Sequence, residues 1–258
     1  MRIHLQSDVH VEFDGATMYP AVCSDVTVCA GDIGLIGAPY KLEKYFDEIQ
    51  KNCEHTIYIL GNHEFYHSDY FDVIEAAQKL CEKRGIIFMD EAVGTENLVL
   101  DGITFWGTTL WTDFNKGDWF AKDKVGRNFG DFHCVSYGDE LTFTADKCYE
   151  INQRSVGKIN WDADIVITHH SPIVIPHPRF QLSDISYGFY NTELEQKIVD
   201  SKIKYWMFGH THHSVKVDVN GTIVLSNQHG YGRTILRNGK IDTQYEGCGY
   251  DPRLIIEI

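Results

Sequence analysis

Several features of membrane and secreted proteins are missing from this sequence of 258 residues. No stretch approaches the roughly 18 apolar residues of a membrane-spanning helix. The N-terminus has no signal-peptide pattern, because a strand-like run begins at Ile3. The seven cysteines are odd in number and scattered, and no two of them form a C-x-x-C pair. We therefore expect a reduced, cytoplasmic protein that does not bind a membrane.

Positive charge is also scarce, because 23 Lys and Arg stand against 37 Asp and Glu, a formal net charge of −14. Binding to duplex nucleic acid needs clustered basic residues, so we expect no extended nucleic-acid surface. The G-x-x-x-x-G-K-[ST] loop is absent, which excludes nucleotide binding of that kind. There is no linker, repeat or low-complexity segment, and 43% apolar residues allow a large core. We predict a single domain, residues 1–258.

Five short apolar runs are present, and each ends in side chains that bind metals. The runs are Ile3–Ser7, Val26–Ala30, Thr56–Leu60, Ile165–Thr168 and Tyr205–Phe208. The clusters that follow them are Asp8-Val9-His10, Gly31-Asp32, Gly61-Asn62-His63-Glu64, His169-His170 and Gly209-His210-Thr211-His212-His213. Runs of β-branched and aromatic residues are typical of buried strands.

One such cluster alone carries little weight, because a single His or Gly-Asp after a strand is usually structural. The ordered set of five is far more specific. In open α/β sheets, ligands bind beyond the carboxyl ends of the strands, so distant segments can deliver Asp, Asn and His to one point. The set therefore predicts a dinuclear metal site.

The motif order Asp-x-His, Gly-Asp, Gly-Asn-His-Glu, His, Gly-His-x-His resembles that of the calcineurin-like metallophosphoesterase superfamily, from Asp8 to His212. The segment from Thr168 to Tyr231 is similar to a bacterial and phage-type branch of small, single-domain members. The resemblance implies an α/β fold, a four-layer αββα sandwich, with two divalent cations at one end of its sheets. It also implies hydrolysis of a phosphomonoester or phosphodiester by a hydroxide that bridges the two ions. A small phosphorylated or nucleotide-like substrate suits the acidic composition.

The resemblance also implies the ligand sets. It assigns Asp8, His10 and His212 to one ion, it assigns Asn62, His169 and His210 to the other, and Asp32 bridges them. Two ions about 3.5–4 Å apart can hold both the attacking and the leaving oxygen of an in-line displacement at phosphorus. Mixed nitrogen and oxygen ligands without thiolate favour Mn²⁺, with Fe or Zn²⁺ as alternatives. If Asp8 and His10 continue an extended strand, they share a face.

His63 has a different role in this family pattern. The resemblance implies that it does not bind metal, but stabilises charge on the phosphoryl group and protonates the leaving oxygen. Glu64 either orients that imidazole or is an exposed carboxylate at a helix start. His170 and His213 have no place in the pattern, and we expect them behind the ligands or facing solvent.

Further absences narrow the class. Phosphoprotein phosphatases of this superfamily follow Gly-Asp with another Asp and an Arg that binds phosphate, whereas here the sequence continues Ile33-Gly34-Leu35-Ile36-Gly37. A Ser/Thr phosphatase therefore remains a less favoured alternative. A binding scaffold with weak or lost catalysis is another, although scaffold members typically lose ligands or the catalytic His. The sequence does not indicate the oligomeric state.

Helical spacing predicts helices at 40–52, 70–83 and 146–160. Asp101-Gly102 and Asn220-Gly221 predict two hairpins, and residues 254–257 a short terminal strand. Residues 112–140 are the least regular segment, and we expect substrate specificity there and in residues 176–193. The expected substrate contacts are Arg127, Asn128, His177 and Arg179, and Trp111, Asp113, His133 and Tyr187 are further candidates.

Overall fold

Two β-sheets form the centre of the computed structural model, which describes residues 1–13, 22–139, 141–178, 181–237, 240–246 and 249–258. The first sheet has the strand order β15-β1-β2-β3-β5. Its strands are β1 (Arg2–Gln6), β2 (Ser24–Ala30), β3 (Cys53–Ile59), β5 (Ile87–Phe88) and β15 (Ile255–Glu257). All neighbours pair in parallel except β15, which runs antiparallel to β1. The expected terminal strand is thus confirmed.

The second sheet has the order β11-β12-β10-β9-β7-β6. Its strands are β6 (Asn97–Leu100), β7 (Ile103–Thr108), β9 (Ile165–Thr168), β10 (Tyr205–Phe208), β11 (Lys216–Val219) and β12 (Thr222–Ser226). Both expected hairpins are present, β6–β7 and β11–β12. The turn residues Asp101, Gly102, Asn220 and Gly221 all have positive φ, the geometry that makes Asp-Gly and Asn-Gly favourable there.

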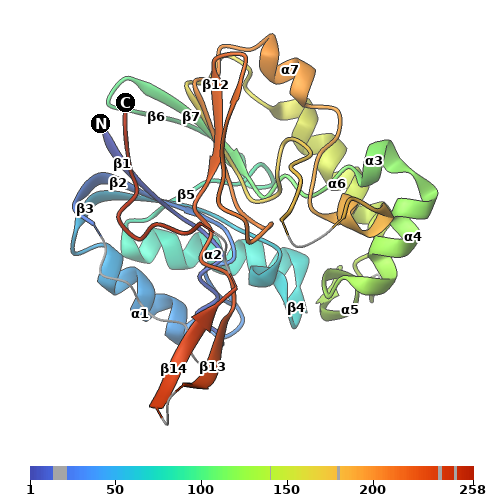
Figure 1. Cartoon of the computed structure of the whole chain (residues 1–258), viewed down its shortest axis with the longest axis horizontal. Helices are drawn as coiled ribbons and strands as arrows, with labels where there is room; N and C mark the ends of the chain where they lie inside the picture. Colours follow the sequence, from blue (N-terminus) through green and yellow to red (C-terminus); the bar gives the residue numbers. More distant parts are fainter. Residues whose placement is uncertain (14–21, 140, 179–180, 238–239, 247–248) are drawn as a thin grey trace.

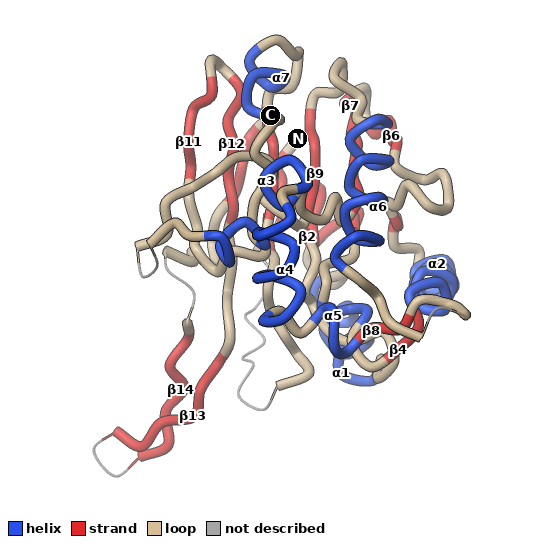
Figure 2. The backbone as a smooth tube through the Cα atoms, turned by 90° about the vertical axis from the view of Figure 1, so that its right-hand side faces the viewer, coloured by secondary structure: helices blue, strands red, loops and turns tan. Residues whose placement is uncertain are grey.

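Helices cover the outer faces of the two sheets, as Figures 1 and 2 show. Helices α1 (Tyr40–Ile49) and α2 (Tyr70–Arg84) pack on the first sheet, through residues such as Phe46 and Ile74. Helices α6 (Ala145–Lys158) and α7 (Glu195–Val199) lie at the second sheet, where Ile198 joins the apolar cluster around Trp206.

A third apolar cluster fills the space between the sheets. It combines residues of the first sheet, such as Leu5 and Val28, with residues of the second, such as Ile167 and Met207, all of them fully buried. The predicted four-layer αββα sandwich is therefore confirmed. The helices expected at 40–52, 70–83 and 146–160 are present with slightly different ends.

Residues 112–140 are more regular than the sequence predicts. They contain the helices α4 (Trp119–Asn128) and α5 (Asp131–Cys134) and the strand β8 (Val135–Ser136), which pairs with β4 (Ser68–Asp69). The short segment α3 (Phe114–Gly117) is a single turn with positive φ at all four residues. The side chains of Asp113 and Asp118 accept hydrogen bonds from the first turns of α3 and α4. Short helical turns η1 (His63–Phe65) and η2 (Asp184–Gly188) lie in the loops after β3 and β9.

The hairpin of β13 (Gly232–Arg237) and β14 (Lys240–Tyr245) projects away from the two sheets in Figures 1 and 2. Its base nevertheless returns to the body of the protein, because Glu246 N donates a hydrogen bond to the Tyr231 carbonyl. Within the described residues, no helix is long and apolar enough to cross a membrane.

Candidate metal centre

The predicted ligands lie in the loops at the carboxyl ends of β1, β2, β3, β9 and β10. Five of them have a left-handed backbone that L-residues rarely adopt, with φ of 55° at Asp8, 51° at His10, 53° at Asp32, 70° at His210 and 48° at His212. Such conformations persist only where the surrounding structure enforces them, and they cluster at functional sites. The chain is therefore bent sharply at these positions.

The expectation that strand alternation points Asp8 and His10 to one face is wrong. Strand β1 ends at Gln6, and both residues lie in the turn that follows it. Their backbone amides instead donate to the carbonyls of Gly31 and Asp32, at 3.0 Å each. The left-handed turn, anchored on the loop after β2, brings the two side chains together.

The first group of candidate ligands is Asp8, His10 and His212, whose ligand atoms lie within 4.8 Å of one another. The Nε2 atoms of His10 and His212 are 3.1 Å apart, and Nε2 of His212 is 3.4 Å from a carboxylate oxygen of Asp8. Asp8 also accepts a hydrogen bond from the His210 amide at 2.9 Å, which joins the loops after β1 and β10.

The second group is Asp32, His169 and His210, which are all buried and meet the same 4.8 Å limit. Asn62 joins them, because its Oδ1 lies 3.0 Å from Nε2 of His169. The other ring nitrogen of His169 donates to the Ala30 carbonyl at 2.9 Å, which turns Nε2 toward the group. Nε2 of His210 is buried and has no hydrogen-bond partner in the described part of the chain.

Asp32 lies between the two groups. Its Oδ2 is 3.7 Å from Nε2 of His10, and its Oδ1 is 3.4 Å from Nε2 of His169. Burial opposes the charge of Asp32, but His169 and His63 outweigh it and hold the pKa of the carboxyl well below its usual range. A charged carboxylate with one oxygen on each side, beside the unpartnered nitrogen of His210, fits a pair of divalent cations.

Two of the motif glycines are explained by close approach. A Cβ on Gly61 would lie 2.2 Å from Oδ1 of Asp32, and one on Gly209 would lie 2.8 Å from Oδ2 of Asp8. Any side chain at either position would displace a candidate ligand. The glycines of Gly-Asn-His and Gly-His-x-His therefore leave room for the carboxylates.

Glu64 fits neither of the two interpretations considered for it. Its carboxylate is fully buried and does not contact His63; instead, it accepts hydrogen bonds from the backbone amides of Asp32, Ile33 and Gly61, at 2.9, 2.8 and 2.7 Å. The Tyr58 hydroxyl is a further donor, at 2.9 Å. Glu64 therefore connects the loops after β2 and β3, both of which carry candidate ligands.

His63 lies at the edge of the first group and is held from both ring nitrogens. Its Nδ1 is 3.1 Å from Oε1 of Glu12, and its Nε2 is 2.9 Å from the hydroxyl of Tyr231. Its ring stacks on Tyr66, with 4.2 Å between the centroids. Burial alone would lower the pKa of His63, but the charges of Asp32 and Glu12 outweigh it and raise the pKa to about 9.

Sequence reasoning missed Glu12, Tyr231 and Asp131. Glu12 stands two residues after His10, so an acidic residue that extends Asp-x-His was the available signal. Asp131 accepts hydrogen bonds from Asn62 Nδ2 at 2.8 Å and from the Tyr66 hydroxyl at 2.7 Å, and thereby orients the Asn62 amide. Tyr231 and Asp131 lie outside the five motifs, and no sequence signal marked them.

A pocket of about 270 Å³ opens over this centre. Asn128 and His177, two of the four expected substrate contacts, are among the residues that line it. Arg127 is not, because its side chain is 75% exposed and pairs with Asp123 at 2.7 Å. Arg179 lies outside the described residues. Within the described part of the chain, no Lys or Arg lines the pocket.

The other candidates serve different purposes. Trp111 is buried in the core beside Phe143, and Asp113 caps α3. His133 is exposed, and Tyr187 packs against the first apolar cluster. Of the histidines outside the pattern, His170 is buried behind the ligands, with its ring 4.1 Å from that of His210, and His213 is partly exposed.

Comparison with known proteins identifies the family of the chain. A viral protein described as uncharacterized, L509 of Acanthamoeba polyphaga mimivirus, is 25% identical over 224 residues, which cover 77% of each chain. The fold is similar to that of the phosphopantetheinyl hydrolase of Mycobacterium tuberculosis, with a TM-score of 0.68, 15% identity and 89% of each chain covered. The family model of the calcineurin-like phosphoesterases, whose members depend on metals, matches residues 1–214. The chain belongs to the calcineurin-like phosphoesterase family.

Proposed function

We propose that the protein hydrolyses a small phosphomonoester or phosphodiester at a dinuclear metal centre. Asp8, His10 and His212 would hold one ion. Asn62, His169 and His210 would hold the other, and Asp32 would hold both. The observation that carries the proposal is the position of Asp32, whose two oxygens face His10 on one side and His169 on the other. Ions in this centre, Mn²⁺ with Fe or Zn²⁺ as alternatives, would supply Lewis acidity and activate a water molecule.

The residues around the centre supply the remaining chemistry. No Lys or Arg lines the pocket in the described part of the chain. His63, whose pKa is raised by the charges of Asp32 and Glu12, is placed to bring positive charge to a bound phosphoryl group. Glu12 holds Nδ1 of the ring, so the proton on Nε2 is the one available to the leaving oxygen. Tyr231, at 2.9 Å from Nε2, orients that proton.

The same arrangement supports an enzyme over a scaffold. A scaffold needs no proton donor, whereas His63 is fixed here by a carboxylate and a hydroxyl at the edge of the centre. No Lys or Arg lines the pocket within the described residues, which also disfavours a Ser/Thr phosphatase that binds phosphate through an Arg.

The test is hydrolysis of 4-nitrophenyl phosphate and bis(4-nitrophenyl) phosphate by metal-stripped protein reloaded with Mn²⁺, with wild type compared against His63→Ala. We expect His63→Ala to keep its metal content and to lose about 10²- to 10⁴-fold in turnover of an alkyl ester such as benzyl phosphate. The loss for the two nitrophenyl esters should be smaller, because nitrophenolate departs without a proton. His210→Ala should instead lose metal and activity together. Absence of turnover by the reloaded wild type for both esters would favour the scaffold, and loss of metal from His63→Ala would show that His63 is a ligand.

A further inference from the structure

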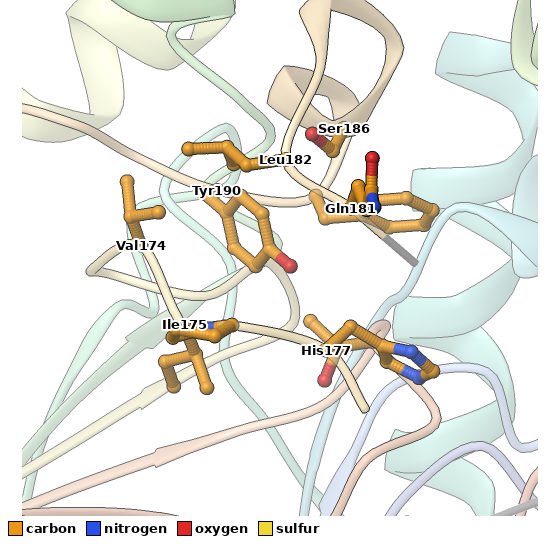
Figure 3. Close-up of a pocket in the computed structure, with 10 residues that line it drawn as sticks. Val174, Ile175, His177, Gln181, Leu182, Ser186 and Tyr190 are labelled. Carbon is orange, nitrogen blue, oxygen red and sulfur yellow. The ribbon is translucent and has the colours of Figure 1, made fainter. Parts of the chain in front are cut away.

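A second cavity, of about 280 Å³, lies beside the pocket over the metal centre. It is formed mainly by the segment between β9 and α7, and Figure 3 shows the side chains around it. Val174, Ile175 and Leu182 surround the ring of Tyr190, whose hydroxyl points toward the side on which His177 lies. The metal ligands and the proton donor proposed above do not account for this cavity.

The cavity adjoins the pocket over the centre, because His177, Phe189 and Thr211 line both. Thr211 lies between the candidate ligands His210 and His212 in the sequence. The ring of Phe189 is 5.3 Å from that of His210. A substrate whose phosphoryl group reaches the centre therefore has this cavity as the adjoining space for its ester group.

The lining is mostly apolar, and no Asp, Glu, Lys or Arg is among its described residues. Its aliphatic part is Val174, Ile175, Pro176 and Leu182, and its aromatic part is Phe189 and Tyr190. Leu182 is 56% exposed at the rim, so apolar surface there is left for a ligand to cover. Polar atoms are confined to His177, Gln181, Ser186, Thr211 and the Tyr190 hydroxyl, the small number typical of sites that orient an apolar ligand.

We propose that this cavity binds an uncharged, largely apolar ester group of about the size of an aromatic ring. The substrate is then a phosphoester of a hydrophobic alcohol. This inference rests on the proposed function, because it requires the phosphoryl group of the substrate to bind at the adjoining metal centre. The cavity would contact the alcohol part of the substrate, whereas the metal centre would contact its phosphoryl group.

The test compares benzyl phosphate with methyl phosphate, which differ in the apolar group but both release a simple alcohol; the corresponding diesters replace them if only diesters react. The readout is the ratio of kcat/KM for the two esters. We expect the wild type to favour the benzyl ester by about tenfold or more, the usual effect of filling an apolar pocket. Val174→Phe, which fills the cavity, and Leu182→Asp, which places a charge at its exposed rim, should each reduce that ratio about tenfold.

Matched controls are Val217→Phe on β11 and Leu141→Asp, whose side chains are 37% and 87% exposed and line neither pocket. Both controls should keep the wild-type ratio. If Val174→Phe does not fold, the ratio measured for Leu182→Asp tests the proposal. A ratio near one in the wild type, or one that neither cavity variant changes, overturns the proposal.

Binding of phosphonates separates this inference from the proposed catalysis. Calorimetry on Mn²⁺-loaded protein should give tighter binding of benzylphosphonate than of methylphosphonate, and Leu182→Asp should remove the difference. If neither ester is hydrolysed but benzylphosphonate is preferred, the proposed function fails and the cavity assignment stands. Equal binding of the two phosphonates would refute the cavity assignment even where both esters are hydrolysed.

Discussion

One carboxylate oxygen of Glu12 lies 3.1 Å from Nδ1 of His63 and also 3.1 Å from Nδ1 of His10. A single acidic side chain therefore orients both the proposed proton donor and a proposed metal ligand. Carboxylates that accept from a ligand's second ring nitrogen fix its tautomer and increase its basicity. Through Glu12, the loop after β1 therefore orients both His63 and His10.

The first prediction concerns Glu12→Gln and pH. Burial lowers the pKa of His63, whereas Asp32 and Glu12 raise it. Bound cations would neutralise Asp32, which leaves Glu12 as the acidic partner of the ring. A raised pKa of a general acid places the alkaline decline of activity at higher pH. Glu12→Gln should therefore move the alkaline limb of the kcat profile to lower pH. It should also raise the Mn²⁺ concentration for half-maximal activity about 10- to 100-fold, because His10 loses its carboxylate partner.

The control is Glu54→Gln, an exposed residue of β3, which should match the wild type in both measurements. If Glu12→Gln has the wild-type pH profile but needs more Mn²⁺ for half-maximal activity, the role of Glu12 is limited to supporting His10.

The second prediction concerns Asp32→Asn. If the two oxygens of Asp32 serve different ions, the amide removes charge from both sites at once. Elemental analysis of reloaded protein should then find about two ions per chain in the wild type and a loss at both sites in the variant. Asp25→Asn, on the same strand, is the control. Saturation of the wild type at one ion would refute the dinuclear centre.

The strands and the candidate ligands were accessible from the sequence because their signals are local. Buried runs such as Ile165–Thr168 are uninterrupted, and Asn220-Gly221 selects its turn by backbone geometry. The ligand motifs follow directly after those strands, so assigning the strands also assigned the edge at which the ligands meet.

The contacts of His63 were not accessible, because they join residues far apart in the chain. Glu12 is 51 positions from His63 and Tyr231 is 168, and both lie in loops whose path no pattern encodes. Helix α4 was missed for another reason. It exposes Trp119 and Phe120 and buries only Ala121 and Val125, so it lacks the apolar stripe by which a helix is recognised.

The third prediction concerns metal removal. The three apolar clusters form without the candidate ligands, so chelated protein should keep its secondary structure by circular dichroism. Each ion that binds only the folded state should stabilise it by about 2.7 kcal/mol at a hundredfold excess over its Kd. That corresponds to a rise in Tm of about 5–10 °C for a chain of this size. Unfolding upon chelation would mean that the centre is structural.

The fourth prediction concerns Glu64→Gln. The carboxylate accepts four short hydrogen bonds, and an amide would turn an NH₂ group toward buried donors. We expect a loss of about 2–4 kcal/mol in the free energy of unfolding, measured with urea, together with weaker metal binding as the two loops separate. Glu75→Gln, at an exposed residue of α2, should unfold at the same urea concentration as the wild type. Equal stability of Glu64→Gln and wild type would remove the connecting role assigned to Glu64.

The last prediction concerns Asp90, which is 4% exposed after β5. Burial raises the pKa of its carboxyl to about 7, and the charge of Glu91 adds to the rise. The Ala92 amide, which donates to Oδ1 at 2.8 Å, acts in the opposite direction. The unfolded chain releases this proton near pH 4, whereas the folded protein keeps it to about pH 7. The contribution of Asp90 to the free energy of unfolding therefore decreases as pH rises between these values, and it is constant above them.

Asp90→Asn keeps the acceptor for Ala92 and removes the titration. Its stability relative to the wild type should therefore increase with pH, by about 2–4 kcal/mol between pH 4.5 and pH 8. Urea unfolding at both pH values measures this, with the exposed Asp139→Asn as control. A difference that does not change with pH would mean that Asp90 is ionised in the folded protein, held by the Ala92 amide despite its burial.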